Sequence, residues 1–274
     1  MRRITLGEES FWTAEALADD LVALGLASGD AVMVHASLRR VGPVLGGADG
    51  VIAALRRVVG PQGCILAYVS WLEQFEDALD DDGRLDPSLK PVIPPFDAAT
   101  SRANPDHGWF AEALRTTPGT RRSGNPGASV AALGAGAEGF TANHPMDYGY
   151  GAGSPFARLA EAGGKVLMLG APWDTMSLLH HAEHIADIPG KHVRRMEVPL
   201  AAEAGVAWQA ITEFDTVDPV VDGLDEDYFA SIVVDFLASG QGQQGQVGDA
   251  PCVLVPAAAM TRFAVNWLER RFRP

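Results

Sequence analysis

The sequence predicts a three-layer α/β/α fold, in which a mostly parallel central sheet carries helices on both faces. Short apolar runs alternate along the chain with longer segments whose apolar residues recur at helical spacing. This alternation is typical of sheets joined by helical crossovers. The 274 residues, of which 47% are hydrophobic, suffice for a large buried core. No internal repeat or linker divides the chain, so we expect a single domain over residues 1–274.

The first half of the chain opens this series. A helix is expected over residues 11–27, because its apolar residues recur at helical spacing. The apolar run at 31–38 predicts the first strand. A helix over 49–60 follows, between an N-capping aspartate and a glycine stop. The run at 63–71 predicts a second buried strand.

The second half continues the alternation. A helix at 107–119 precedes a short strand at 129–134. The helix at 154–164 is marked by a serine N-cap, a proline in the first turn and a double-glycine stop. The remaining predicted elements are a strand at 165–171, a helix at 174–188, a β-ribbon at 192–215, a helix near 225–239, a strand at 252–255 and a last helix at 257–271.

A long insert separates the second strand from the next helix. Residues 72–106 are rich in acidic, proline and turn residues. Segments of this length without regular structure are usually functional loops or disordered ones in compact domains. We therefore expect the insert to contribute to a binding site or to be a solvated loop.

Composition narrows the partners and the compartment. The formal charge of −14 and the pI of about 4.8 disfavour nucleic acid and anionic membranes, and favour cationic ligands. No stretch reaches the roughly 18 apolar residues that span a bilayer, and the first residues lack a signal core. The two cysteines, Cys64 and Cys252, lie in apolar runs. We expect buried thiols and a cytoplasmic protein.

Several common site motifs are missing. The chain has no G-x-G-x-x-G, no P-loop and no G-x-S-x-G elbow. Ligands on α/β sheets bind where strands end and helices begin. The candidate segments are therefore HASLRR after the first strand, YVSW after the second and GAPWDT after the strand at 165–171.

The stretch LLHHAEH at 178–184 allows three interpretations. His180 and His184 lie one helical turn apart and could hold zinc, with Glu183 as a base. Alternatively, one histidine is a partly buried base whose second nitrogen is held by a carboxylate. The third interpretation is that the histidines are structural or lie on the surface.

Longer stretches resemble the aminoglycoside 3-N-acetyltransferases. The resemblance is carried by VHASLRRVGPVLGGADGVIAALRRVVGPQGCILAYVSW, PGTRRSGNPGASVAALG, GSPFARLAEAGGKVLMLGAPWDTMSLLHHAEHIADIPGK and NWLERRF. The similarity runs in order from about residue 14 to 272, and the block ending in IPGK is highly specific. It implies the α/β/α fold of the antibiotic N-acetyltransferases, distinct from the GNAT fold. It also implies acetyl-CoA as the donor, an aminoglycoside as the acceptor and a role in antibiotic resistance.

The resemblance assigns catalytic roles to three residues. In the family's L-H-x-A-E motif the first histidine is the base, and here that residue is His180. Its neutral imidazole would take a proton from the 3-amino group of the acceptor, which then attacks the thioester directly. Asp215, after the ribbon, would orient the ring and stabilise the imidazolium, without any covalent nucleophile. His35 matches a family histidine on the donor side.

Binding residues follow from the same resemblance and from the local pattern. Ser154 is included because a helix N-terminus favours phosphate. The donor contacts expected are His35, Ala36, Ser37, Leu38, Arg39, Arg122, Ser123 and Ser154. The acceptor contacts expected are Trp71, Glu73, Asp174 and Glu183, because a polycationic sugar needs acidic groups in place of water.

The chain departs from the family where R-S-x-H-P is usual and Arg122-Ser123-Gly124-Asn125-Pro126 is present. Asn125 can form hydrogen bonds but cannot titrate, so the range of acceptors is open. We expect no metal, no nucleic acid and no membrane partner, and a monomer or homodimer. Two alternatives remain: a zinc metallopeptidase using His180, Glu183 and His184, and a non-catalytic protein that binds acyl-CoA or polyamines.

Overall fold

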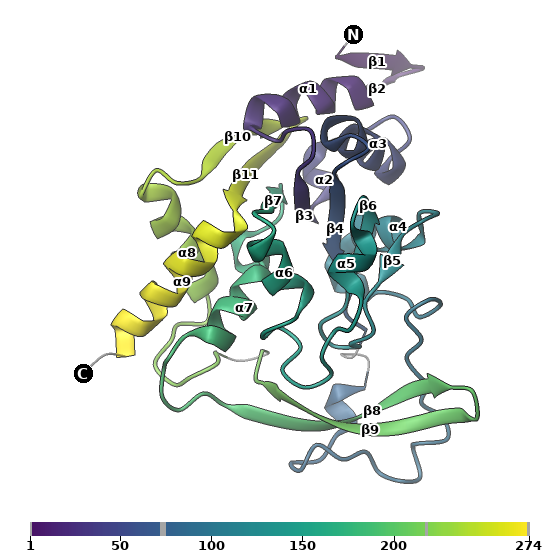
Figure 1. Cartoon of the computed structure of the whole chain (residues 1–274). Coiled ribbons are helices and arrows are strands. Elements are labelled where there is room, and N and C mark those ends of the chain that lie inside the picture. Colours follow the sequence, from purple (N-terminus) through teal and green to yellow (C-terminus); the bar gives the residue numbers. More distant parts are fainter. Residues whose placement is uncertain (1, 72–74, 217–218, 273–274) are drawn as a thin grey trace.

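A mixed sheet forms the centre of the protein. The computed structural model describes residues 2–71, 75–216 and 219–272. The sheet has seven strands in the order β10-β11-β7-β3-β4-β6-β5 (Figure 1). Their bounds are β3 (Ala31–Ala36), β4 (Cys64–Tyr68), β5 (Arg121–Arg122), β6 (Val130–Gly134), β7 (Lys165–Leu169), β10 (Gln243–Val247) and β11 (Ala250–Pro256).

The parallel part of the sheet is narrower than the sequence predicts. β3 pairs in parallel with β4 on one side and with β7 on the other. The outer pairs are antiparallel. Short connections reverse the chain between β5 and β6 and between β10 and β11, whereas parallel strands need a longer crossover, usually a helix. The α/β prediction is thus confirmed, with its parallel pairs confined to the centre.

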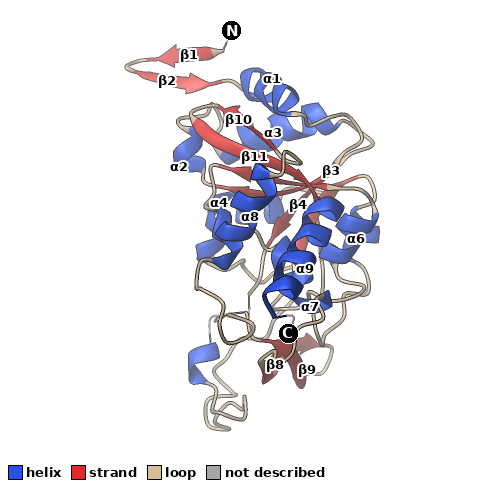
Figure 2. Cartoon of the chain, turned by 90° about the vertical axis from the view of Figure 1, so that its left-hand side faces the viewer, coloured by secondary structure: helices blue, strands red, loops and turns tan. Residues whose placement is uncertain are grey.

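Helices cover both faces of the sheet, as predicted (Figure 2). Alternate side chains of β3 enter two separate clusters: Val32 and Val34 face one layer, and Met33 faces the other. The first layer contains α1 (Ala14–Leu24), α2 (Leu38–Val41), α3 (Ala48–Val59) and α4 (Gly108–Thr116). The second contains α5 (Ala137–Thr141), α6 (Pro155–Glu161), α7 (Leu178–Ile185), α8 (Tyr228–Ala238) and α9 (Ala257–Phe272). None of the helices described is both long and apolar enough to cross a membrane.

The ribbon lies outside the sheet, at the bottom of Figure 1. β8 (Val193–Ala202) and β9 (Gly205–Phe214) pair antiparallel over their whole length. Residues 75–104 of the insert run beside β8, where Phe96 both donates to Pro199 and accepts from Ala201 at 2.8 Å. Gly83 makes this approach possible, because a Cβ there would collide with the backbone of Arg195. We call residues 75–104 together with β8 and β9 the arm.

Several elements were not predicted. A hairpin of β1 (Arg3–Leu6) and β2 (Glu9–Trp12) precedes α1. β10 lies within the low-complexity GQGQQGQVG stretch, and its side chains are mostly exposed. An edge strand of this kind pairs through its backbone, so side-chain periodicity gives no signal for it.

Candidate active site

A pocket of about 700 Å³ lies between the sheet and the arm. One side, which we call the core wall, consists of lining residues from 34–39, 106–111 and 171–180 together with Tyr68. The other side, the arm wall, consists of Glu76, Arg194, Met196, Ile211, Glu213 and Phe214. The core wall contains the ends of β3, β4 and β7, so the pocket lies where open α/β sheets usually bind ligands.

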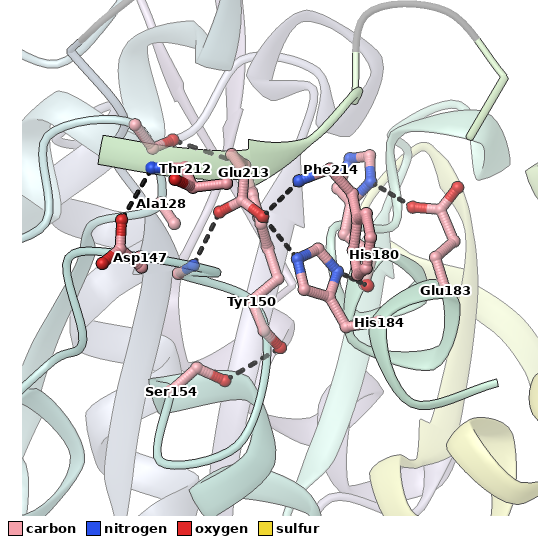
Figure 3. A network of polar contacts seen from close by, with 12 residues as sticks. Ala128, Asp147, Tyr150, Ser154, His180, Glu183, His184, Thr212, Glu213 and Phe214 are labelled. Atoms are coloured by element: carbon pink, nitrogen blue, oxygen red, sulfur yellow. Dashed lines mark hydrogen bonds and ion pairs between the residues drawn. The ribbon is translucent and has the colours of Figure 1, made fainter. Parts of the chain in front are cut away.

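His180 projects from α7 into this pocket, and a buried carboxylate holds its ring (Figure 3). Nδ1 of His180 lies 2.7 Å from Oε2 of Glu183, whose side chain is 1% exposed. The hydroxyl of Tyr228 donates to the other oxygen of Glu183. Within the described part of the chain Nε2 has no hydrogen-bond partner, so the basic nitrogen is available to a ligand in the pocket.

Two predicted roles change with this geometry. Glu183 was expected to anchor a cationic acceptor, but it is buried and bonded to His180 and Tyr228. Asp215 was expected to orient His180, yet Glu183 makes that contact because it lies one turn along the same helix. Asp215 instead lies at the end of β9, 3.8 Å from Arg194.

Two further histidines line the pocket beside His180. Burial, together with the neighbouring His107 and His180, lowers the pKa of His35 to about 3. The Nε2 atom of His35 is buried without a partner among the described residues. Burial likewise lowers the pKa of His107 to about 4. Its Nε2 lies 2.5 Å from the hydroxyl of Ser70. Both rings are therefore neutral at physiological pH.

Two tyrosines complete the floor of the pocket. The hydroxyls of Tyr68 and Tyr150 lie 2.6 Å apart, and Tyr68 donates to the carbonyl of Gly127 at 2.8 Å. The ring of Tyr150 packs against His180 at 4.8 Å between centroids, and Tyr68 packs against His107 at 4.4 Å. Tyr68 and Tyr150 thus pack against the rings of His107 and His180 and help to hold them in place.

His184 is bonded at both ring nitrogens. Nδ1 lies 2.7 Å from the carbonyl of His180, and Nε2 lies 2.5 Å from Oε1 of Glu213. A zinc ligand needs a free nitrogen lone pair, and neither nitrogen of His184 offers one. Among the described residues no group of three or more His, Cys, Asp or Glu could hold a metal ion. The geometry therefore gives the zinc interpretation no support.

The predicted donor-side residues divide into two groups. His35, Ala36, Ser37, Leu38 and Arg39 all line the pocket, because β3 ends there and α2 begins. Arg122, Ser123 and Ser154 are outside it and have structural contacts instead. Arg122 donates to the carbonyls of Ser101 and Val69.

The two serines are fully buried. The hydroxyl of Ser123 accepts from the backbone of Val130, and Ser154 caps α6. We had expected both to meet the donor, but burial leaves no oxygen for a ligand.

The predicted acceptor-side residues also divide. Asp174 is exposed and lines the pocket. Trp71 is 4% exposed and packs against Phe75 and Phe96 inside the arm's apolar cluster, so its predicted contact with substrate is not supported. Glu73 lies outside the described residues.

Comparison with known proteins decides the family. The model of a family described as aminoglycoside 3-N-acetyltransferase matches residues 33–269. The chain belongs to the aminoglycoside 3-N-acetyltransferase family. It is 44% identical to aminoglycoside N(3)-acetyltransferase III of Pseudomonas aeruginosa, over 93% of each chain. It is 40% identical to aminoglycoside N(3)-acetyltransferase VII of Streptomyces paromomycinus, over 94% of this chain and 92% of the relative.

Solved structures agree with this family. A structure of AAC-IIIb in a binary complex with CoASH superposes with a TM-score of 0.94 at 64% identity, covering 96% of this chain and 98% of that one. Sisomicin-bound AAC-VIa superposes with a TM-score of 0.89 at 36% identity, covering 96% and 100%. The predicted antibiotic N-acetyltransferase fold is confirmed, and the chain is an acyltransferase.

Asn125 is a departure of this acetyltransferase from the family pattern. Its side-chain amide donates to the carbonyls of Pro145 and Met146, and its oxygen accepts from the backbone of Ala128 at 2.9 Å. Asn125 lines the pocket, yet it is 2% exposed and its polar atoms are bonded within the protein. It holds the turn at 145–146 in place.

The sequence missed several pocket residues of the acetyltransferase. These are His107, Trp109, Tyr150, Arg194 and Glu213. Arg194 and Glu213 lie near the two ends of the predicted ribbon. Their position near the ends of a predicted element could therefore have marked these two residues as pocket residues. Side-chain type alone did not distinguish the missed pocket residues from core residues.

Proposed function

We propose that the protein transfers the acetyl group of acetyl-CoA to the 3-amino group of 2-deoxystreptamine aminoglycosides, with His180 as the general base. The observation that carries this proposal is the pair of His180 and Glu183, which leaves Nε2 of His180 free in the pocket. Family membership supplies the reaction class. The CoA complex of AAC-IIIb and the sisomicin complex of AAC-VIa support the two substrates.

The proton has a defined path in this proposal. Acetyl-CoA supplies the thioester carbon, to which the amino nitrogen bonds as the carbon–sulfur bond breaks. The sulfur leaves as a thiolate, which takes up a proton from water and becomes CoA thiol. Nε2 of His180 accepts the proton that the amino group loses. Glu183 stabilises the resulting imidazolium, and Tyr228 holds Glu183 in place. A carboxylate bonded to Nδ1 also fixes the tautomer in which Nε2 is basic.

The pocket offers suitable groups to both substrates. The backbone at Ala36, Ser37 and Leu38 and the exposed cation of Arg39 line the side on which we place the donor. Asp106, Asp174 and Glu76 line the pocket as carboxylates for the ammonium groups of the acceptor. Acetylation would remove one positive charge from the drug, which is the basis of the resistance role that we propose.

A thiol-release assay with the purified full-length protein tests this function. We expect CoA thiol in the presence of acetyl-CoA and drugs such as sisomicin, at a rate that EDTA does not change. A drug already acetylated at its 3-amino group is the matched control and should release no thiol. Release of no thiol with any 2-deoxystreptamine drug would overturn the proposal and leave a binding protein. Inactivation by EDTA would favour a metal enzyme.

A further inference from the structure

Glu213 joins three segments of the chain at the edge of the pocket (Figure 3). Its Oε1 lies 2.5 Å from Nε2 of His184 on α7 and accepts from the backbone N–H of Phe214 at 2.8 Å. Its Oε2 accepts from the backbone N–H of Gly149 at 2.6 Å. The side chain therefore ties the end of the arm and the loop before α6 to the helix that carries His180.

The partners of His184 determine its protonation. Nδ1 lies 2.7 Å from the carbonyl oxygen of His180, and a carbonyl oxygen can only accept. Nδ1 must therefore carry a proton. Nε2 faces Oε1 of Glu213, a carboxylate whose two oxygens each accept a backbone N–H group as well. An ionised carboxylate also only accepts, so Nε2 carries a proton as well.

Some of the other groups around His184 oppose a positive charge on its ring, and others favour it. Nζ of Lys191 lies 3.0 Å from its backbone carbonyl, and His181 and His180 lie on the same helix. Positive charge on Lys191 or His181 opposes a cationic ring. The side chain of His184 is only 2% exposed, so its pairing with Glu213 is little screened by solvent.

The remaining contacts are aromatic and favour a cation. The rings of Tyr148, Tyr150 and Phe214 lie 6.3, 5.6 and 4.9 Å from the ring of His184. The rings of Tyr150 and Phe214 lie within the about 6 Å over which the face of an aromatic ring attracts a cation, and the ring of Tyr148 lies beyond it. Glu213 is the only carboxylate with a contact to His184 among the residues that the structure describes.

We propose that His184 is an imidazolium whose two N–H groups clamp Glu213 and the carbonyl of His180, and that this clamp positions the base. His184 is thus a positioning residue, since it touches the turn that carries His180 and not the substrates. The kinetic part of this inference rests on the proposed function, whereas the charge of His184 does not depend on it.

Nitrogen NMR of the imidazole rings tests the charge directly. In the full-length protein at about pH 8, where an unperturbed histidine with a pKa near 6.5 is neutral, we expect both ring nitrogens of His184 to be protonated. His184→Gln identifies the signals by their loss. In Glu213→Gln the ring should lose one proton and become neutral. A neutral ring in the wild-type protein would overturn the proposal.

Kinetics test the positioning. A glutamine at 184 can still donate to Glu213, but it is uncharged and cannot also reach the carbonyl of His180. His184→Gln should lower kcat and kcat/KM by the same factor, about ten- to hundredfold, since the base is displaced and not the substrate. His181→Gln is the matched control on the same helix and should keep most activity, because glutamine can still donate to the carbonyl of Tyr150.

The outcomes separate the two proposals. If His184→Gln retains full activity, the clamp does not position the base, even if the ring is charged. If the wild-type protein acetylates no drug, the proposed function fails, and the NMR result still decides whether His184 is an imidazolium.

Discussion

The two walls of the pocket are held by different parts of the molecule. The core wall rests on the sheet, whose side chains are buried on both faces by two large clusters. The arm wall rests on a small cluster of its own, formed by Trp71, Phe75, Phe96 and three ribbon residues. The base and its carboxylate belong to the core side, and the charged pair of Glu76 and Arg194 to the arm. The wall that rests on the two large clusters thus carries the base, and the wall that rests on the small cluster carries the ion pair of Glu76 and Arg194.

Replacing the base is the strongest test of this difference. His180→Gln should lower kcat about 10²- to 10⁴-fold, because general-base catalysis contributes that much, and should leave the fold intact. Thiol release and circular dichroism check the two effects. His192→Gln, whose side chain is 41% exposed outside the pocket, is the control and should be fully active. More than a tenth of wild-type activity in His180→Gln would place the base elsewhere.

The next largest effect is expected at the carboxylate behind the base. Glu183→Gln keeps the shape of the side chain but removes the charge that stabilises the imidazolium. A hydrogen bond to a charged group contributes about 1.5–3 kcal/mol, so kcat should fall about ten- to hundredfold.

The corresponding acid-to-amide substitution at Asp215 tests which carboxylate, Glu183 or Asp215, orients His180. Asp215→Asn should change kcat much less than Glu183→Gln, because Asp215 lies beside Arg194 and Nδ1 of His180 is bonded to Glu183. A larger loss in Asp215→Asn would restore it as the orienting carboxylate.

The core wall was largely predictable from the sequence, whereas in the arm only the ribbon was. Apolar strands and capped helices fix where β3, β7 and α7 end, and these ends place His35, Ser37 and His180 in the pocket. The family resemblance named His180 as the base. It assigned the orienting role to Asp215, because a linear motif does not show which carboxylate the ring meets.

The arm depends on contacts between segments far apart in the chain. Trp71 follows a strand and is therefore a natural candidate for a ligand contact, but Phe96 and the ribbon bury it. Arg122 and Ser123 are similar cases, in which a polar residue near a strand end meets backbone groups that the folded chain brings together. Ser154 instead accepts from the backbone of its own helix as the predicted N-cap. The antiparallel direction of β6 likewise depends on its pairing with β4, a strand far away in the sequence.

His144, in the loop between α5 and α6, should lower the free energy of unfolding as the pH falls. Burial lowers the pKa of His144 to about 4, with Arg158 adding to the effect. In the folded state the ring stays neutral until about pH 4, while the unfolded chain takes up a proton below about pH 6.5. Stability should therefore fall as the pH drops through this window, by up to about 2 kcal/mol from this residue at pH 5.

Denaturant unfolding from pH 8 to pH 5 measures that slope. His144→Gln should be less stable than the wild type at pH 8, because it loses the bonds to Ser123 and Gly149. Its stability should fall less steeply toward pH 5. An unchanged slope would mean that His144 is not the group that takes up the proton on unfolding.

The smallest expected effects are on the arm, and they should appear in KM. Nη1 of Arg194 lies 3.2 Å from Glu76, so a cation lies in a pocket that we propose receives a polycation. Arg194→Gln should lower KM for the aminoglycoside by up to about fivefold, since charge pairs of this exposure contribute about 0.2–1 kcal/mol. Glu76→Gln removes the negative charge paired with Arg194, so the pocket becomes more positive and KM should rise by a similar factor.

Opposite signs and salt dependence distinguish charge from loosened packing. Both shifts in KM should shrink as the salt concentration rises, because added ions screen charges at the pocket mouth. In both variants kcat should stay near the wild-type value, since Arg194 and Glu76 bond to each other and the ring of His180 is held by Glu183. A fall in kcat in both variants, insensitive to salt, would show that Glu76 and Arg194 help to position the catalytic groups, as Glu213 is proposed to do.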